Sequence, residues 1–431
     1  MRAGFFSRTI TPPVGYEMPG GFQKRFATGI ADDLRTNAVY IEAADAAVAI
    51  VSIDCVSFDD DVAATARALV REHTGLPASS VLIAATHTHT GGPTGDVLMS
   101  EKHPWYCTWV AEQAATAVIC ACQNATDATV GSGSATVEGI GHNRRWHIAD
   151  GTVQTNPGRI PLEQRIRPAG PVDDELSVIG VWDLSGTPLG AVLNYTCHTT
   201  FMSGLSYSAD YSGAIERHLG MPVVFLNGAM GDINQIDFSD PGDRGKYTGP
   251  DYTEQTGRKL AAAAEQVLRT VARTADVAAP VASRIDTTRL PVRRPEPDEL
   301  EQAAALWEHA EGQLTTEQIY ARELVLLDAM VAESGSMVPC ELQSVRIGRM
   351  RLTAAPLQPF CELGLAIKAA VGRNTMVVSL ANGCLGYLGP LLAYAEGGYE
   401  LTLKRTSRLA PGSGERYVDA AIAALAQLEG R

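Results

Sequence analysis

Two histidines separated by one residue, His87 and His89, are the first side chains in this sequence whose spacing suggests chemistry. They follow a short apolar run, Val81–Thr86, and precede the turn Gly91-Gly92-Pro93. In an extended chain alternate side chains point the same way, so we expect both imidazoles on one face. Two imidazoles on one face often begin a metal site. A polar strand end bonded to a loop is the alternative, and the glycine turn favours a functional role because it admits a ligand close to the backbone.

Further polar candidates stand outside this pair. His198 ends another apolar strand, where a histidine alone is more often a core residue, and only its combination with the pair makes it a ligand candidate. Arg144 and Arg145 offer planar donor forks that suit a carboxylate or phosphate of a substrate, although a solvated loop pair explains them equally well. Asp54 ends the strand beside the His87 strand, and we expect it to orient an imidazole.

Composition limits the partners of this protein. The 431 residues carry 49 acidic and 35 basic side chains, a net charge of -14, which disfavours nucleic acid and anionic membranes. We therefore expect a small-molecule substrate, and the sequence sets no oligomeric state. The stretch Met1–Thr11 lacks the apolar run of a signal peptide, and no segment has the pattern of a membrane span. Eight scattered cysteines without a CxxC pair predict free thiols in a reducing compartment, so a cytoplasmic location is expected.

The elements around the histidines alternate between strand and helix, which predicts an α/β fold. The strands Ala38–Ala43 and Ala47–Asp54, a helix over 59–73 and the strand Val81–Thr86 predict a right-handed crossover and a parallel pair. Continuing this pattern gives a mixed α/β fold with largely parallel sheets flanked by helices. The other predicted helices are Pro104–Asn124, Ser212–Leu219 and Tyr252–Val271, and the other strands are Leu176–Leu184, Leu189–His198, Pro222–Asn227, Glu341–Ile347, Met350–Ala355 and Met376–Ala381.

Domain organisation is predicted to be simple. Residues 1–431 are interpreted as a single domain, with 274–282 the weakest candidate for a boundary and 297–333 a charged helical excursion on the surface. Several apolar strands run directly into polar, often glycine-rich loops. Because ligands in open α/β sheets bind beyond the carboxyl ends of strands, we expect these loops to converge on one site.

A set of short segments spread along the chain in order carries a family resemblance. These segments are Ile10–Gly15, Ser52–Asp54, Ala85–Pro93, Asn143–Arg145, His198, Ser208–Gly213, Asn227–Asn234, Pro356–Lys368, Ala381–Leu388 and Glu396–Glu400. They resemble the neutral/alkaline non-lysosomal ceramidase family, and in particular its shorter bacterial relatives, for which no C-terminal β-sandwich is expected. The resemblance covers nearly the whole chain, and it implies a neutral-ceramidase-like catalytic domain.

Zinc-dependent amide hydrolysis is the activity that this resemblance implies. It places metal ligands on His87, His198 and Tyr387, with His89 beside the metal as a substrate or proton-handling group. A zinc ion with three protein ligands keeps one position for water and lowers the pKa of that water. Asn234 is a further catalytic candidate, although an Asx role in its own glycine-rich turn explains it as readily. Tyr387 has the alternative of a packed aromatic in a tight loop.

Two departures from the family pattern bear on the chemistry. Where relatives carry a glutamate ligand in a Pro-Gly-Glu turn, this chain reads Pro356-Leu357-Gln358. Gln358 is a neutral candidate ligand, so zinc is expected to bind less tightly, to be replaced by another metal, or to be lost. The serine that follows the Gly-Asp pair in true ceramidases is missing after Gly231-Asp232, so ceramide itself is not the expected substrate.

Three functions remain open from the sequence. The first is a metal-dependent hydrolase that cleaves an amide of a small polar metabolite with metal-activated water. The second is a non-hydrolytic enzyme, for cyclisation, isomerisation or acyl transfer, with the histidines as acid and base groups. The third is a non-catalytic binding protein that kept the fold.

Overall fold

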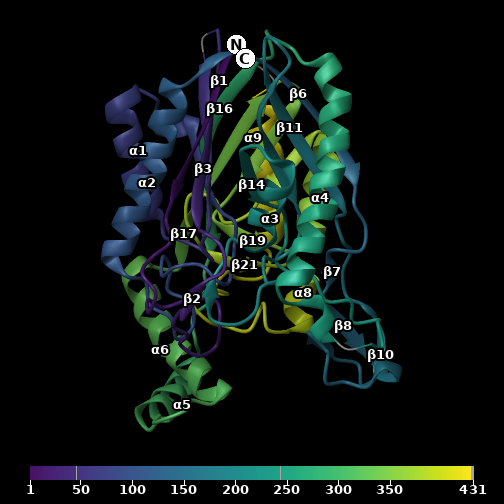
Figure 1. Ribbon diagram of the computed structural model, residues 1–431. Helices are drawn as coiled ribbons and strands as arrows, with labels where there is room; N and C mark the ends of the chain where they lie inside the picture. The colour runs from purple at the N-terminus through teal and green to yellow at the C-terminus, as the bar shows by residue number, and fades with distance from the viewer. Residues whose placement is uncertain (45, 243, 429–431) are drawn as a thin grey trace.

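The computed structural model describes residues 1–44, 46–242 and 244–428. Two sheets lie against each other through a shared apolar core, and helices cover their outer faces (Figure 1). The large sheet runs in the order β14 (Val223–Asn227), β12 (Pro188–Tyr195), β11 (Glu175–Asp183), β6 (Thr126–Thr136), β1 (Arg2–Thr9), β3 (Arg35–Ala43), β4 (Ala46–Ile53) and β5 (Val81–Ala85). The second sheet runs in the order β16 (Val281–Pro291), β17 (Met337–Ile347), β18 (Met350–Ala354) and β20 (Thr375–Val378).

Helices pack on both outer faces, so the strands beneath them are buried on two sides and read as nearly continuous apolar runs. Every residue of β5 is buried, for example. One pair of helices covers one half of the large sheet, a second pair covers the other half, and a third covers the second sheet. These pairs are α1 (Asp60–Thr74) with α2 (Pro104–Gln123), α3 (Asp210–Leu219) with α4 (Pro250–Val271), and α7 (Cys361–Val371) with α9 (Ser413–Ala426).

Strand directions differ from the expectation of largely parallel sheets. The mixed α/β class is confirmed, and so is the predicted parallel pair of β4 and β5. The pair β12 and β14 at the other end is also parallel, but the pairs between these two ends are antiparallel. Only the expectation of largely parallel strands was wrong, because it gave the strand-helix-strand unit around β5 more weight than the hairpins. Tight hairpins, such as the one joining β3 to β4, force neighbouring strands to run in opposite directions.

Residues 379–382 connect the two edges of the large sheet. The backbone N–H of Ser379 donates to the carbonyl oxygen of Asn227, at the end of β14, over 3.0 Å. The N–H of Asn382 donates to Ile83 in β5 over 2.7 Å. Beyond the strands, Thr199 Oγ1 donates to the Thr86 carbonyl at 2.5 Å. The carboxyl ends of β5 and β12 are therefore held together although five strands lie between them in the sheet order.

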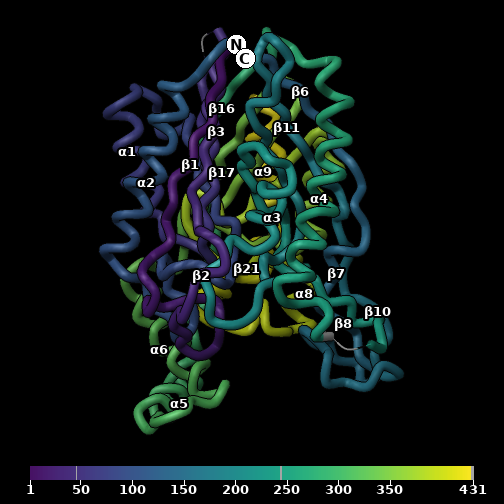
Figure 2. Tube along the Cα trace, viewed as in Figure 1, coloured from purple at the N-terminus to yellow at the C-terminus, as the bar shows by residue number. Residues whose placement is uncertain are grey.

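A pair of helices, α5 (Pro297–Glu308) and α6 (Thr316–Ser334), extends from one end of the molecule where the sequence predicted a helical excursion (Figure 2). Its base is anchored by Glu323, which is fully buried and accepts hydrogen bonds from the guanidinium of Arg405. Within the described part of the chain, no helix is long and apolar enough to cross a membrane. The remaining short elements are α8 (Leu391–Glu396), β2 (Gly29–Ile30), β7 (His142–Asn143), β8 (Arg145–Ile148), β9 (Val153–Thr155), β10 (Arg165–Pro168), β13 (Ser206–Tyr207), β15 (Ile233–Asn234), β19 (Leu357–Pro359) and β21 (Gly386–Leu388).

Candidate metal centre and active site

His87, His89 and His198 meet where the two edges of the large sheet are joined. One ring nitrogen from each histidine lies within 4.8 Å of those of the other two. The Nε2 atoms of His87 and His89 are 3.2 Å apart, and the ring centroids of His87 and His198 are 4.7 Å apart. The predicted convergence of the strand-end loops is therefore present for the loops after β5 and β12. Three nitrogens this close, from separate segments, form a set that could hold one metal ion.

Backbone carbonyls fix the orientation of all three rings. The Nδ1 atom of His87 lies 2.5 Å from Val56 O, that of His89 lies 3.0 Å from Gly20 O, and that of His198 lies 2.8 Å from Met230 O. A carbonyl oxygen only accepts hydrogen bonds, so each Nδ1 carries the hydrogen. The lone pair of each Nε2 is then available to bind a metal ion in the site. This is the anchoring by outer groups that metal-binding histidines generally show.

His87 reaches this position through an unusual backbone conformation. Its φ angle is +67°, in the left-handed region that non-glycine residues rarely adopt. The expectation of an extended His87–His89 segment was wrong, because β5 ends at Ala85 and the chain then turns sharply. A conformation of this kind costs about 1–3 kcal/mol and persists where its surroundings enforce it. Here the strained turn aims the imidazole at the two other rings.

Asp54 does not orient an imidazole, which corrects the second expectation about this region. Its carboxyl oxygens accept hydrogen bonds from the Thr86 hydroxyl at 3.0 Å and from the Arg35 backbone N–H at 2.8 Å. The Val56 carbonyl, two residues further along the chain, takes the imidazole instead. Asp54 therefore supports the turn that carries His87 rather than the ring itself.

Burial keeps the imidazoles neutral. His87 and His198 are almost fully buried, whereas His89 is half-buried. Loss of solvation lowers the pKa of His87 to about 4 and places the pKa values of His89 and His198 well below their usual value. Neutral imidazole is the form that binds metal ions.

Tyr387 and Gln358 complete one wall of the site. The Tyr387 hydroxyl lies 3.3 Å from His198 Nε2. Gln358 is paired with Tyr387 in register in the parallel strands β19 and β21, so the two side chains share a face. Among the described residues, the buried Oε1 atom of Gln358 has no hydrogen-bond partner. A buried amide oxygen without a donor is costly, and a bound cation would satisfy it.

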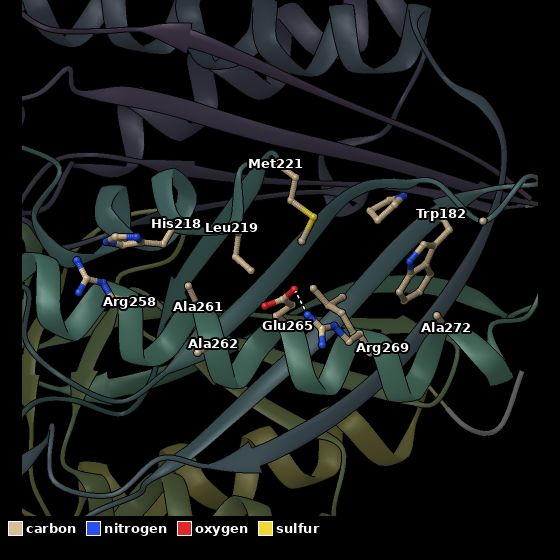
Figure 3. Close-up of a pocket in the computed structure, with 13 residues that line it drawn as sticks. Trp182, His218, Leu219, Met221, Arg258, Ala261, Ala262, Glu265, Arg269 and Ala272 are labelled. Carbon is tan, nitrogen blue, oxygen red and sulfur yellow. Dashed lines mark hydrogen bonds and ion pairs between the residues drawn. The ribbon is translucent and has the colours of Figure 1, made fainter.

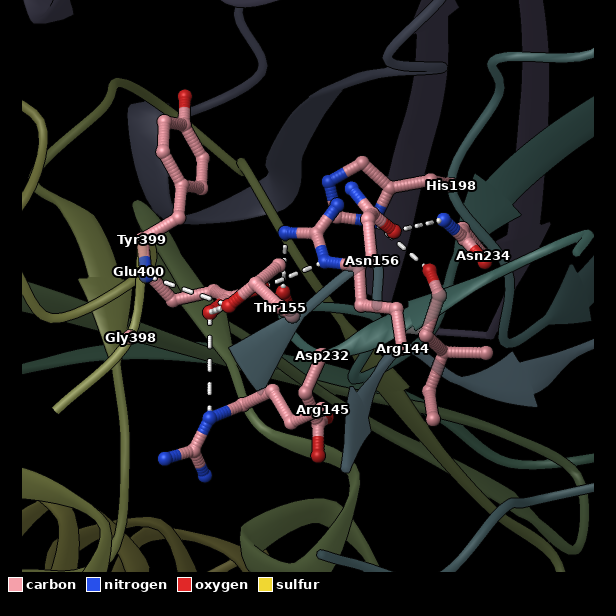
Figure 4. Close-up of polar contacts among 12 residues, drawn as sticks. Arg144, Arg145, Thr155, Asn156, His198, Asp232, Asn234, Gly398, Tyr399 and Glu400 are labelled. Carbon is pink, nitrogen blue, oxygen red and sulfur yellow. Dashed lines mark hydrogen bonds and ion pairs between the residues drawn. The ribbon is translucent and has the colours of Figure 1, made fainter. Parts of the chain in front are cut away.

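Arg144 places a guanidinium beside the histidines (Figure 4). Its Nε donates to Glu400 at 2.6 Å, and its Nη2 donates to Gly231 O at 2.8 Å and to the Tyr387 hydroxyl at 3.2 Å. Burial raises the pKa of Tyr387, and the neighbouring Arg144 partly offsets that rise. Arg144 thus lies where it can contact a substrate group bound next to Tyr387.

Arg145 and Asn234 have other neighbours. Arg145 donates to Gly397 O at 2.9 Å and to Glu396 at 3.3 Å, and its guanidinium lies over the ring of Phe360. Asn234 donates to Asn156 at 2.9 Å and accepts from the backbone N–H of Ile236. Both side chains brace loops around the site in this arrangement, and their predicted substrate-binding and catalytic roles remain predictions.

Several residues of the site were not predicted as such. Glu400, which is fully buried, pairs with Arg144, and Tyr399 packs edge-on against Tyr387 with ring centroids 6.0 Å apart. Gly20 supplies the carbonyl for His89, and a Cβ at its position would lie 2.7 Å from His89 Nδ1. The run Gly397-Gly398-Tyr399-Glu400 is the local signal that could have indicated this loop, because it sets a charge and an aromatic ring beside two glycines.

A separate cavity of about 610 Å³ lies between α3, α4 and the β11–β12 hairpin (Figure 3). Its lining includes Trp182, Met221 and Leu268, with His218 and Arg269 at the rim. His218 and Arg269 are paired with Glu254 and Glu265 respectively. His87, His89 and His198 lie outside this cavity. The candidate active site is therefore the histidine centre and not this cavity.

Comparison with solved structures identifies the architecture around this centre. A neutral ceramidase from Pseudomonas aeruginosa aligns with a TM-score of 0.72 over 99% of this chain and 74% of its own chain, at 21% sequence identity. The chain has the neutral ceramidase fold. A second structure, a ceramidase complexed with C2, aligns with a TM-score of 0.74 over 100% of this chain and 75% of its own, at 19% identity.

The neutral ceramidase fold is thus confirmed as the resemblance implied. At these identities the likeness is one of fold. No family model matches the sequence, and no curated protein matches it either. In this neutral ceramidase fold the half-buried His89 lies within hydrogen-bonding reach of His87, and the Tyr387 hydroxyl lies within reach of both His198 and the buried Arg144.

Proposed function

We propose that this chain is a zinc-dependent hydrolase that cleaves an amide bond of a small polar metabolite. The observation that carries the proposal is the meeting of three Nε2 lone pairs, each fixed by a backbone carbonyl behind its ring, beside the Tyr387 hydroxyl. The two solved structures with the same fold are named ceramidases, and ceramide is an amide, which supports this reaction class.

His87, His198 and Tyr387 are the proposed ligands, with Gln358 as a neutral fourth. Their donor atoms suit zinc, which binds imidazole nitrogen and oxygen, and the unpaired Oε1 of Gln358 fits a cation nearby. When bound, zinc supplies a Lewis acid that polarises an amide carbonyl and acidifies water.

His89 is the proposed proton carrier. It is the most exposed of the three imidazoles, so it is the one that meets the substrate. In hydrolysis, water adds to the carbonyl carbon, the C–N bond breaks, and the nitrogen that leaves must gain a proton. His89 Nε2 is the proposed group that takes this proton from the attacking water and passes it to the nitrogen, and Gly20 O holds its ring in place. Arg144 is proposed to bind the carbonyl oxygen or an adjacent anionic group of the substrate, because charge-assisted donors stabilise developing negative charge.

A small polar substrate, rather than a long-chain lipid, is supported by two features. No serine follows Gly231-Asp232, and the net charge of -14 disfavours adsorption to anionic membranes. Hydrolysis of long-chain ceramide in detergent is therefore expected to be negligible.

Metal analysis combined with turnover tests this function. Protein purified without added metal is analysed by mass spectrometry and then assayed, with and without zinc, on a panel of small amides and on ceramide. Zinc near one equivalent with zinc-dependent release of amine supports the proposal. Bound metal without amide cleavage would favour a non-hydrolytic enzyme, and neither metal nor turnover would favour a binding protein.

A further inference from the structure

An aromatic series leads from the histidine centre to the surface. The ring of Tyr387 contacts that of Tyr399 at 6.0 Å between centroids, Tyr399 contacts Phe22 at 5.7 Å, and Phe22 contacts Tyr320 at 6.2 Å. Exposure rises from 6% for Tyr387 to 38% for Phe22, and Tyr320 beyond it is half-buried. Phe22 and Tyr320 come from parts of the chain far from the Tyr387–Tyr399 segment, so the fold brings these rings together.

Phe22 lies in the loop that also orients a histidine. Gly20 accepts the hydrogen bond of His89 Nδ1, and Arg25 donates to His89 O at 2.7 Å. Gln23 donates to Leu314 O at 2.8 Å, which ties the same loop to the turn before α6. A ring that is more than one-third exposed and yet anchored on both sides is available to a ligand without unfolding of the loop.

Tyr320 is supplied by the base of the helical excursion. On the next turn of α6, the buried Glu323 pairs with Arg405, and Arg322 donates to Leu98 O at 2.7 Å. Burial raises the pKa of Tyr320 to about 12, and the negative charges of Glu400 and Tyr387 add to that rise. The α5–α6 pair therefore contributes a side chain to the aromatic series that leads to the site, instead of forming an isolated protrusion.

We propose that Phe22 and Tyr320 determine substrate specificity by binding a planar ring on one side of the scissile amide. This inference rests on the proposed function and names its substrate class. Aromatic rings attract other rings in stacked or edge-on arrangements at centroid distances of about 4.5–7 Å. The separations within the series lie in that range, and the partly exposed ring of Phe22 can extend it by one more ring. Tyrosine hydroxyls nearby suit polar substituents on such a ring.

Binding of two matched amides tests this assignment. Benzamide and cyclohexanecarboxamide have the same heavy atoms, but only the first has a planar ring. Zinc-loaded wild-type protein is expected to bind benzamide about tenfold more tightly by calorimetry, since ring pairs contribute about that factor. Phe22→Leu and Tyr320→Leu, which keep apolar volume and lose the ring, are expected to reduce the preference about three- to tenfold each. Tyr320→Phe should keep it.

Phe26→Ala is the matched control, because Phe26 is a phenylalanine of the same loop that is 50% exposed. It should leave the preference unchanged. Circular dichroism checks that each variant is folded. Equal affinity of wild type for the two amides, no detectable binding of either, or an unchanged preference in folded Phe22→Leu and Tyr320→Leu would overturn the assignment. Failure of the proposed function would give a different result: the protein would bind the ring-containing amide selectively but would hydrolyse no amide.

Discussion

The hydroxyl oxygen of Tyr387 lies 3.3 Å from Nε2 of His198, a residue 189 positions earlier in the chain. The ring of His87 packs edge-on against that of His198, and Arg144 donates to the Tyr387 hydroxyl. Because His198 Nδ1 is occupied by backbone carbonyls, its Nε2 and the tyrosine oxygen are both available as ligands. This relationship makes the metal assignment testable one ligand at a time.

Removal of either proposed imidazole ligand should remove zinc. His87→Ala and His198→Ala are each expected to lose bound zinc by mass spectrometry, because loss of one ligand from a small set weakens binding by about 10- to 100-fold or more. Circular dichroism should show a retained fold. His218→Ala, on α3 and paired with Glu254, is the control and should keep its zinc. Equal zinc content in all four proteins would refute the assignment.

The oxygen of Gln358 should set zinc affinity. We expect affinity measured by calorimetry to rise in the order Gln358→Met, wild type, Gln358→Glu, because a carboxylate donates more strongly than an amide and a thioether does not suit zinc as an oxygen does. Activity need not follow, since an added negative charge weakens the metal as a Lewis acid. Three indistinguishable affinities would remove Gln358 from the site.

Arg144 should matter for turnover even when its charge is kept. Arg144→Lys cannot make the three contacts of the guanidinium, so kcat/KM is expected to fall about 10- to 100-fold with little change in zinc content. Arg144→Met should also destabilise the protein by about 3–5 kcal/mol, because it leaves Glu400 buried without its partner. Adding Glu400→Gln should restore much of that stability but not the activity. Recovery of activity in the double variant would show that Arg144 acts only on folding.

The titration of Asp54 should make the protein less stable as pH rises. Burial raises the pKa of Asp54 to about 8, whereas an unfolded aspartate titrates near about 3.9. Between these values the folded state holds a proton that the unfolded state lacks, so the free energy of unfolding decreases as pH rises. Asp54→Asn stays neutral and can still pair with Arg35 N–H and Thr86, so its denaturation by urea should depend less on pH between 5 and 8. The exposed Asp127→Asn should behave like wild type, and parallel curves for all three proteins would contradict the prediction.

The sequence predicted the elements around the site better than the sheet that joins them. The sequence segments that form β4, α1, β5 and α2 have clear apolar periodicity or turn boundaries. The histidines could be selected as candidates because they come directly after such strands. β6 was missed because Thr126–Thr136 is rich in glycine, serine and threonine and has a single large apolar residue, Val130. The roles of Val56 O and Gly20 O were also hidden, because a backbone acceptor carries no residue signature. Contacts such as Phe22 with Tyr320 join distant segments, which local pattern does not encode.

The link made by residues 379–382 has a consequence for how the protein is made. All eight strands of the large sheet are complete by Asn227, yet the backbone groups at its two edges are paired only after the ribosome has produced Asn382. During that interval the nascent chain presents open strand edges, which invite pairing with other chains. Synthesis of the second sheet and of α5–α6 therefore prolongs a period in which the unfinished protein depends on protection from aggregation. A stop codon just before Ser379 should yield an insoluble product, although the large sheet would contain every one of its strands.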